Sequence, residues 1–404
     1  MKRYPEYKES GVEWIGEMPE YWEMKRLKYI ADLNMGQSPP SEEYNSDQIG
    51  TPFLQGNAEF GSHHPTPKIY CPTARKHANP GDILLSVRAP VGAINIANQE
   101  YGIGRGLCAI RPQTNQFERR YAKYLLEVIR VELHVVATGS TYEAVTVNEV
   151  SNLTCVVPPF SEQTQIANFL DRKTEQIDEL IRIKDRQIEL LQEQRTALIN
   201  QAVTKGLDPN VEMKPSGVEW IGEIPAHWNL SMLKYAARLV YGDTLISEKR
   251  EEGVVPVYGS NGIIDTHSAA NTLSPAIIVG RKGSLGKIQY SDVPCFVIDT
   301  AYFIDSRTSH VNLRWLYYVF QSLKLERFRN SVLPGLNRES AESQYTPLIT
   351  EEEQTQIANF LDHKTEQIDE LIAAEQRKIE LLKEYRQSLI SEAVTGKIDV
   401  RNEV

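Results

Sequence analysis

Isoleucine and leucine recur at helical spacing through two long, charged segments of this 404-residue chain. In the first segment they stand three, four, seven or eight positions apart, at Ile166, Leu170, Ile177, Leu180, Ile188, Leu191 and Leu198. This pattern predicts one helix from Ser161 to about Ala202, with Ser161 and Thr164 supplying its start. At 1.5 Å per residue such a helix is roughly 60 Å long, which is too long for a local core element.

The helical segment is repeated in the second half of the chain. Residues 163–181 read QTQIANFLDRKTEQIDELI, and residues 354–372 differ from them only in having His363 where the first copy has Arg172. A second repeat, SGVEWIGE, occupies residues 10–17 and 216–223. The chain is therefore two half-copies in tandem. Two near-identical helices can bury their apolar stripes against each other as a two-stranded coiled coil; the alternative is that each packs on its own globular domain.

The stretches between the repeats, 34–157 and 240–350, show almost no mutual similarity. Short apolar runs bounded by proline and glycine predict strands at 82–87, 108–110, 276–279 and 295–298. Amphipathic patterns predict helices at 121–133 and 313–328. We therefore expect two α+β domains on a shared scaffold, with surfaces that have diverged because each reads something different.

Several strings, together with this order of segments, resemble a known family. They are PGDILLSVRAPVG at 80–92, VYGSNG at 257–262, GRKGSLG at 280–286, LPGLNR at 333–338, and EQ-x-x-IA-x-FLD opening each helix. Over essentially its full length the chain is similar to the specificity subunits of type I restriction-modification systems. The resemblance implies an α+β fold in which two target-recognition domains of mixed β-sheet and helix, 1–158 and 206–350, are separated by two long helical spacers, 159–205 and 351–404. The helices would form an antiparallel coiled coil within a pseudo-twofold tandem repeat.

The resemblance also implies a function. Each domain would read one half of an interrupted double-stranded DNA site, the helices would fix the gap, and separate subunits would carry out adenine methylation and ATP-driven cleavage. The expected partners are DNA, two modification (methyltransferase) subunits and restriction subunits. S-adenosylmethionine, ATP and magnesium would belong to those partners, so this chain would be no enzyme and bind no cofactor. The alternatives are a coiled-coil scaffold, or the DNA-recognition part of a methyltransferase or nuclease with an unrecognised active site.

The net charge of −10 at first argues against DNA binding. However, residues 21–158 carry 13 basic and 13 acidic side chains, and residues 227–347 carry 13 and 11. The acidic excess lies elsewhere, with 7 basic and 13 acidic side chains in residues 348–404 alone. Since phosphate attraction sets nonspecific affinity, we expect basic partner subunits to supply much of the DNA binding.

Candidate DNA contacts are polar or cationic residues clustered with glycine, where the backbone can approach phosphate and side chains can reach base edges. The alternative for each is an ordinary turn residue or surface charge. In the first domain the candidates are Gln37, Ser38, Gln55, Asn57, Arg88, Arg105, Ser140 and Thr141. In the second domain they are Tyr258, Ser260, Asn261, Arg281, Lys282, Ser284, Lys287, Asn337 and Arg338.

Apparent catalytic and metal motifs fail on inspection. Residues 157–160, VPPF, resemble the [ND]PP[YF] motif of adenine methyltransferases, but Val157 stands where an Asn or Asp must accept the amino-group hydrogen bonds. Residues 280–287 resemble a phosphate loop, yet Ile288 replaces its Ser or Thr. A metal site at His63, His64, Cys71 and His77 matches no known ligand spacing, so we expect none. The four scattered cysteines and the lack of a membrane-span-length apolar run predict a cytoplasmic protein.

Overall fold

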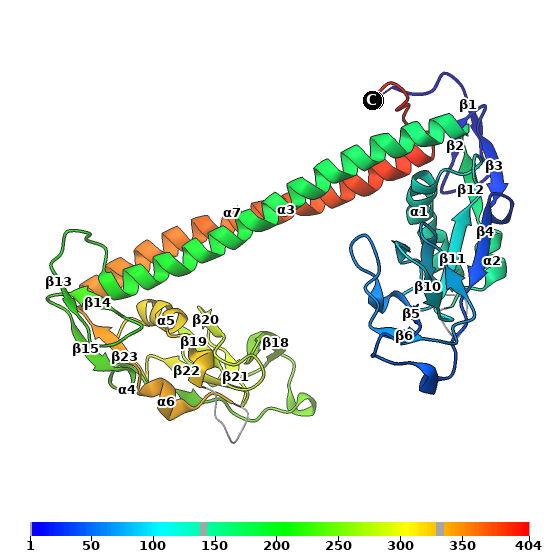
Figure 1. The fold of residues 1–404 in the computed structure, drawn as a ribbon. Coiled ribbons are helices and arrows are strands. Elements are labelled where there is room, and N and C mark those ends of the chain that lie inside the picture. The colour runs from blue at the N-terminus through cyan, green and yellow to red at the C-terminus, as the bar shows by residue number, and fades with distance from the viewer. Residues whose placement is uncertain (1, 138–143, 329–334, 404) are drawn as a thin grey trace. The chain divides into compact units, whose positions relative to one another are not determined.

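The computed structural model describes residues 2–137, 144–328 and 335–403 (Figure 1). The chain divides into two compact units. Unit 1 comprises residues 1–183 and 378–404, and unit 2 comprises residues 184–377. Each unit is described by itself below.

Unit 1 contains short strands, two helices and parts of the two long helices. Its strands are β1 (Tyr7–Glu9), β2 (Glu17–Pro19), β3 (Glu23–Arg26), β4 (Ala31–Met35), β5 (Thr51–Leu54), β6 (Ile69–Cys71), β7 (His77–Ala78), β8 (Ile83–Ser86), β9 (Ile94–Ile96), β10 (Tyr101–Ile103), β11 (Leu107–Pro112) and β12 (Thr154–Val157). Its helices are α1 (Arg119–Ala137) and α2 (Val147–Ser151), with 3-10 turns at η1 (Leu27–Tyr29), η2 (Ser41–Glu43) and η3 (Asn57–Glu59).

Unit 2 has a similar order of elements, without counterparts of η3 and β7 among its described residues. Its strands are β13 (Met213–Pro215), β14 (Glu223–Pro225), β15 (Asn229–Met232), β16 (Val240–Tyr241), β17 (Val255–Gly259), β18 (Gly262–His267), β19 (Ala276–Gly280), β20 (Ile288–Ser291), β21 (Phe296–Val297), β22 (Ala301–Asp305) and β23 (Tyr345–Leu348). Its short helices are α4 (Leu233–Ala236), α5 (Leu313–Ser322) and α6 (Arg338–Glu342), with 3-10 turns at η4 (Ser247–Lys249) and η5 (Leu325–Phe328).

The two units share the strand order of the main sheet, and their second sheets differ by one strand. The main sheet has the order β4-β11-β8-β9 in unit 1 and β16-β22-β19-β20 in unit 2. A second sheet, β6-β5-β10-β7 or β18-β17-β21, contains a parallel pair in each unit, β5 with β10 and β17 with β21. The small pairs β1-β2 and β3-β12 correspond to β13-β14 and β15-β23. The expected tandem repeat therefore extends through the stretches whose sequences differ.

Local sequence explains where the elements begin and end. The apolar run before Ser86 is buried throughout and forms β8, a central strand of the first main sheet. The helix predicted at 313–328 begins after Asn312, whose side chain accepts from two backbone N–H groups of the first turn. It ends at Ser322 because Lys324 has φ +46°, a left-handed conformation that a helix cannot continue through. The prediction of one helix over this range was therefore too long.

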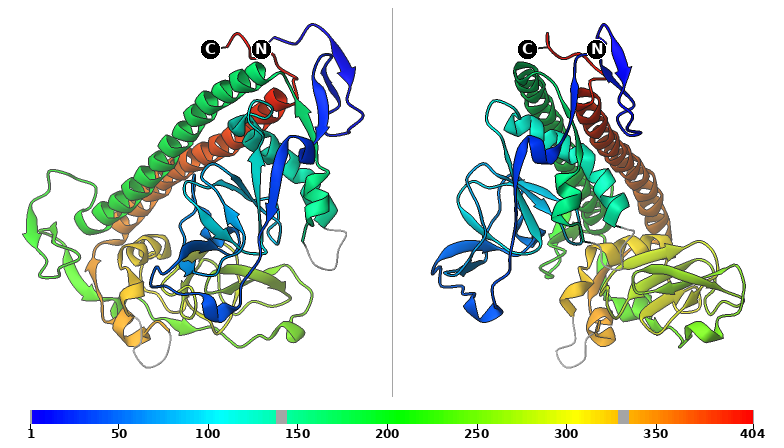
Figure 2. Two further views of the ribbon diagram at one scale, coloured as in Figure 1. Left: turned by 45° about the vertical axis from the view of Figure 1, so that its right-hand side comes forward. Right: turned by 90° about the vertical axis from the view of Figure 1, so that its right-hand side faces the viewer.

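The two long helices are α3 (Phe160–Lys205) and α7 (Glu351–Val394), and Figure 2 shows them in two further views. The start predicted for α3 was wrong by one residue. The helix already begins at Phe160, so Ser161 lies inside its first turn rather than at the cap. At α7, Thr350 and Glu353 form a capping box, since each side chain accepts from the other's backbone N–H at 3.2 Å.

The long helices run antiparallel within each unit, as expected. In unit 1, Asp178 of α3 pairs with Arg386 of α7 at 3.0 Å. In unit 2, Lys184 pairs with Glu375 at 2.9 Å and Arg195 pairs with Asp369 at 2.9 Å. Residue numbers thus rise along one helix as they fall along the other. The alternative, in which each long helix packs on its own globular domain, is also present, because the first turns of each helix pack into the core of such a domain.

Each core combines a domain with the ends of both long helices. In unit 1, Trp22 and the first turns of α3, at Ile166 and Leu170, share a core with the last turns of α7, at Ile390 and Val394. In unit 2 the corresponding buried residues are Trp228, Ile357, Leu361, Ile199 and Val203. The two sequence repeats meet here, since the end of each helix packs on a copy of the Trp-containing opening. No helix among the described residues is long and apolar enough to cross a membrane.

Candidate nucleic-acid interface

Two hairpins with the same backbone geometry carry several of the candidate DNA contacts. Between β8 and β9, the N–H of Gly92 donates to the Ser86 carbonyl at 2.9 Å. Between β19 and β20, the N–H of Gly286 donates to the Gly280 carbonyl at 2.8 Å. Both closing glycines have positive φ, 85° and 76°. The hairpins are therefore equivalent, and they place Arg88 of unit 1 at the same position as Lys282 of unit 2.

In each unit a glycine brings a second loop against the segment that follows β10 or β21. A Cβ on Gly36, just after β4, would lie 2.1 Å from the Gly104 carbonyl oxygen, and one on Gly242, just after β16, would lie 2.2 Å from that of Ile298. Only glycine allows this approach. The next residue donates its backbone N–H to the neighbouring segment, from Gln37 to the Ile103 carbonyl at 2.9 Å and from Asp243 to the Val297 carbonyl at 3.0 Å.

The loops after β5 and β17 carry a third set of candidates. Gln55 and Asn57 follow Leu54, whose carbonyl accepts from the Gly104 N–H at 2.8 Å. Ser260 and Asn261 follow Tyr258, whose carbonyl accepts from the Ile298 N–H at 3.0 Å. Tyr258 therefore stands where unit 1 has the buried Leu54, and it is 8% exposed. Its ring belongs to a small core with Ile278 and Val297, which gives it a packing role that the sequence did not indicate.

In unit 1 the candidates gather around one hollow. Ser38, Gln55, Asn57, Arg88 and Arg105 all line a hollow of about 580 Å³, at the end of the main sheet where β4 and β8 finish. The Arg105 N–H donates to the Ser38 hydroxyl oxygen at 3.1 Å, which holds two of these segments together. Gln37 is exposed next to Ser38. The remaining candidates, Ser140 and Thr141, lie outside the described residues.

In unit 2 a group of cations and tyrosines occupies the same end of the sheet. The Arg281 guanidinium lies 4.8 Å from the Tyr241 ring centre and 5.8 Å from that of Tyr302, and it donates to the Asp299 carbonyl at 3.0 Å. The Arg338 guanidinium lies 5.4 Å from the centre of the same Tyr241 ring. Burial raises the pKa of Tyr302 to about 12, so its hydroxyl stays protonated and donates to the Leu336 carbonyl at 3.0 Å.

Other candidates in unit 2 already have partners within the domain. Lys282 forms an ion pair with the Asp299 carboxylate at 3.2 Å. Lys287 donates to the Asn261 carbonyl oxygens of the backbone and the side chain, at 2.8 and 3.0 Å. Asn337 caps α6, since its side chain accepts from the backbone N–H of the third helical residue. Ser284, half-buried, lies in the turn of the hairpin.

Residues that fasten each domain to its long helix were missed in the sequence. In unit 1 the Asp171 carboxylate of α3 accepts from Arg120 Nη1 at 2.9 Å and from the Tyr124 hydroxyl at 2.8 Å, both on α1. In the same repeat, Gln163 accepts from the Glu118 backbone N–H at 2.8 Å. These contacts tie the first turns of α3 to the helix that packs on the main sheet.

Unit 2 repeats this arrangement. The Asp362 carboxylate accepts from Arg314 Nε and from the Tyr318 hydroxyl, both at 2.6 Å. Burial and the bond to Asp362 hold the pKa of Tyr318 above its ordinary value, so the hydroxyl remains a donor. The sequence signal that could have found both groups is Arg-x-x-x-Tyr, which occurs at 120–124 and again 194 positions later at 314–318.

The residues considered for a metal site bind other groups. His64 Nδ1 lies 3.0 Å from the Ile96 carbonyl, and His77 Nδ1 lies 2.9 Å from the Glu100 carboxylate. Cys71 is a buried free thiol. Across the described ranges, no three His, Cys, Asp or Glu side chains are placed to hold a metal ion together.

The fold and this paired arrangement define a two-domain protein with one recognition frame in each half. By recognition frame we mean the β8–β9 hairpin with the loops after β4 and β5 in unit 1, and the β19–β20 hairpin with the loops after β16 and β17 in unit 2. A model of the type I restriction modification DNA specificity domain matches the chain twice, over residues 19–190 and 227–383. The chain therefore belongs to the family of type I restriction-modification DNA specificity proteins.

Curated relatives agree with this assignment. A putative type I restriction enzyme MjaX specificity subunit of Methanocaldococcus jannaschii is 37% identical over 202 residues, covering 49% of this chain and 46% of the relative. The MjaIX specificity subunit of the same organism is 27% identical over 197 residues, covering 46% of this chain and 44% of the relative. The matched regions thus span about half the length of these relatives.

Solved structures share the fold. A chain from a type I R-M system, studied for complex assembly and conformational transition, has a TM-score of 0.74 at 18% identity and covers 94% of this chain and 99% of its own length. The HsdS subunit from Thermoanaerobacter tengcongensis has a TM-score of 0.51 at 18% identity, covering 96% of this chain and 100% of its own.

Proposed function

We propose that this chain reads a two-part double-stranded DNA site and directs adenine methylation and restriction by partner subunits, without catalysing either reaction. Residues 1–158 would read one half-site and residues 206–350 the other, with the helical segments 159–205 and 351–404 as spacers. The relatives named as restriction-enzyme specificity subunits support the class of function.

One observation carries the proposal. The two units hold equivalent loops with the same backbone hydrogen bonds but present different side chains from them, such as Arg88 against Lys282 and Gln37 against Asp243. A scaffold protein would have no reason to keep the loops and change their exposed residues. Reading two different base sequences needs this combination, because base edges are distinguished by the donors and acceptors that a side chain presents.

The long helices offer surfaces for the partner subunits. Leucines stay exposed at repeat-equivalent positions, with Leu180 and Leu381 in unit 1 and Leu371 and Leu190 in unit 2. Exposed leucine on a helix that already buries one stripe fits a further packed helix or subunit. Since the positions occur in pairs, we propose two modification subunits, one for each half, with restriction subunits joining that assembly.

The chemistry is assigned to these partners. In the adenine methyltransferase motif the first residue accepts hydrogen bonds from the adenine amino group, but here that residue is Val157, which offers no side-chain acceptor. S-adenosylmethionine, ATP and magnesium would accordingly be bound by the partner subunits.

The proposal is tested by mapping methylated adenines. The chain alone should methylate nothing, and the chain co-expressed with its cognate adenine methyltransferase should methylate one interrupted motif. Replacing Arg281 and Lys282 by alanine should relax the second half-site and leave the first unchanged.

The matched control replaces Arg88 and Arg105 by alanine, which should relax the first half-site only. Methylation by the chain alone would contradict the non-catalytic assignment. Equal relaxation of both half-sites by either double variant would contradict the assignment of one reader to each half.

A further inference from the structure

Asp243 holds a position in unit 2 that marks it as part of the recognition frame. It follows Gly242 at the end of β16, as Gln37 follows Gly36 at the end of β4, and both donate their backbone N–H to the equivalent strand. The β19–β20 hairpin, which carries Arg281, leaves the main sheet at this same end, because Gly280 pairs with Ala301 there. Asp243 is exposed.

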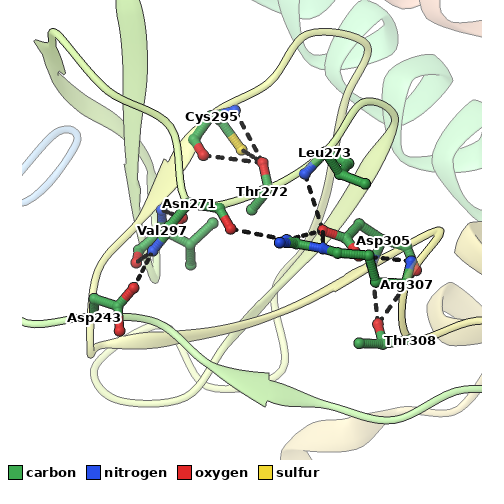
Figure 3. Close-up of polar contacts among 9 residues, drawn as sticks. All are labelled: Asp243, Asn271, Thr272, Leu273, Cys295, Val297, Asp305, Arg307 and Thr308. Carbon is green, nitrogen blue, oxygen red and sulfur yellow. Dashed lines mark hydrogen bonds and ion pairs between the residues drawn. The ribbon is translucent and has the colours of Figure 1, made fainter.

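The Asp243 carboxylate is held in place by Asn271, as Figure 3 shows. Asn271 Nδ2 donates to Asp243 Oδ2 at 2.9 Å and to the Val297 carbonyl at 2.9 Å. Asn271 Oδ1 accepts from the Val297 backbone N–H at 2.8 Å. Both edges of the amide are therefore fixed by the strand, which leaves one amide proton aimed at the aspartate. The described residues give Asp243 Oδ1 no hydrogen-bond donor.

The loop carrying Asn271 is itself fastened. Arg307 Nη2 donates to the Asn271 carbonyl at 2.9 Å, and Arg307 forms an ion pair with Asp305, whose side chain is fully buried (Figure 3). The neighbouring Thr272 accepts from the Cys295 N–H at 2.9 Å. The half-buried Asn271 is thus held by backbone groups of the strand and, through Arg307, by the buried Asp305 side chain, so the orientation it gives Asp243 is set before any ligand arrives.

An exposed, oriented carboxylate at this position cannot serve as a phosphate contact, because both groups are negatively charged. It can only accept hydrogen bonds from the DNA. In the major groove adenine presents an amino donor beside an N7 acceptor, guanine presents two acceptors and thymine presents an acceptor and a methyl group. Cytosine alone presents the amino donor without an acceptor, so a carboxylate suits cytosine best.

We propose that Asp243 is a specificity-determining residue that accepts a hydrogen bond from the amino group of a cytosine in the second half-site, with Asn271 as its positioning residue. This inference rests on the proposed function. The equivalent Gln37 carries an amide that both donates and accepts, so the first half-site would have a different base at the corresponding position.

The test compares the complete chain and its variants, each co-expressed with the cognate methyltransferase, by mapping methylated sites. The wild-type motif should contain a cytosine in its second half. Asp243→Asn keeps the size of the side chain but adds a donor, so preference for that cytosine should fall by about tenfold at this one position. The first half-site and the gap should stay as they were. Asn271→Ala should weaken the same preference by a smaller factor.

Asp292→Asn is the matched control. Asp292 is an exposed carboxylate that follows β20, at the end of this strand away from the β19–β20 hairpin. This substitution should leave the motif unchanged. If Asp243→Asn abolishes methylation, Asp243→Glu, which keeps the acceptor, should restore adenine methylation at sites that carry the wild-type cytosine. A second half-site without cytosine, or one read identically after Asp243→Asn, overturns the inference while leaving the two-part reader intact. Absence of any interrupted motif with the wild-type chain overturns the proposed function itself.

Discussion

Removing the Asp362 carboxylate should loosen the second domain from its long helix. Asp362 accepts two hydrogen bonds of 2.6 Å, from Arg314 and Tyr318. A hydrogen bond to a charged group contributes about 1.5 to 3 kcal/mol to stability. The ion pair is partly exposed, with 34% of the Arg314 side chain and 37% of the Asp362 side chain accessible, so solvent screening reduces its share. We expect Asp362→Ala to lower the free energy of unfolding by about 2 kcal/mol.

The assay is denaturant unfolding of the complete chain, followed by tryptophan fluorescence. Trp315, which follows Arg314, is buried, so its emission contributes to the unfolding signal of this domain. A double-mutant cycle between Asp362→Ala and Arg314→Ala should give a coupling free energy of about 1 kcal/mol. Glu366→Ala, an exposed glutamate one turn further along α7, is the control and should change stability by less than about 0.5 kcal/mol.

A coupling free energy below about 0.3 kcal/mol would refute the reasoning, because independent residues add within that error. The repeat supplies an internal check. Asp171→Ala removes the equivalent carboxylate from unit 1, so its effect should be of similar size.

Two further predictions concern pH and the spacer. Burial favours the neutral acid of Glu353, but hydrogen bonds from the His227 ring and the Trp228 indole outweigh it and lower its pKa to about 2 from 4.5. This depressed pKa stabilises the fold above pH 4.5 by at most about 3 kcal/mol, a figure that solvent screening of the partly exposed pair reduces, and that contribution is lost as pH falls towards 2. Between pH 7 and pH 3 the free energy of unfolding should therefore fall less for Glu353→Gln than for the wild type. An equal fall in both proteins would contradict the depressed pKa of Glu353. Seven residues inserted after both Arg186 and Arg377, at the same place in each repeat, should lengthen the helices by about 10 Å and widen the DNA gap by about three base pairs. An active insertion variant with an unchanged gap would show that the helices are not the spacer.

The sequence predicted the scaffold well because its signals are local or repeated. The helical period and the apolar runs of β8 and β19 depend on residues close together in the chain, and the copy at an offset of 191 is visible as near-identity of two segments. Errors arose where one residue decides the outcome. Lys324 stops α5 from continuing to Phe328 by adopting a positive φ, and nothing in its side chain indicates this conformation.

The equivalence of the variable stretches could not be seen from sequence. The two frames depend mainly on backbone hydrogen bonds, which leave no side-chain signature. At the offset of 194 that relates the hairpins, identity survives at scattered positions such as Gly92 with Gly286 and Tyr124 with Tyr318. Asp243 was missed for a similar reason. An aspartate after a glycine is typical of a turn, and the Asn271 that orients it lies 28 positions away.

The division between constant and variable residues follows from which atoms carry each contact. The anchoring contacts use side chains, such as Asp171 and Asp362, so those residues must stay the same in both halves. The proposed reading positions are fixed by main-chain hydrogen bonds, from Gln37 to one strand and from Asp243 to the other. Any residue except proline can occupy such a position, because only its backbone N–H is used. Only the glycine before it is constrained, because a Cβ there would meet a carbonyl oxygen. One frame can therefore present different base-reading groups without a change of fold.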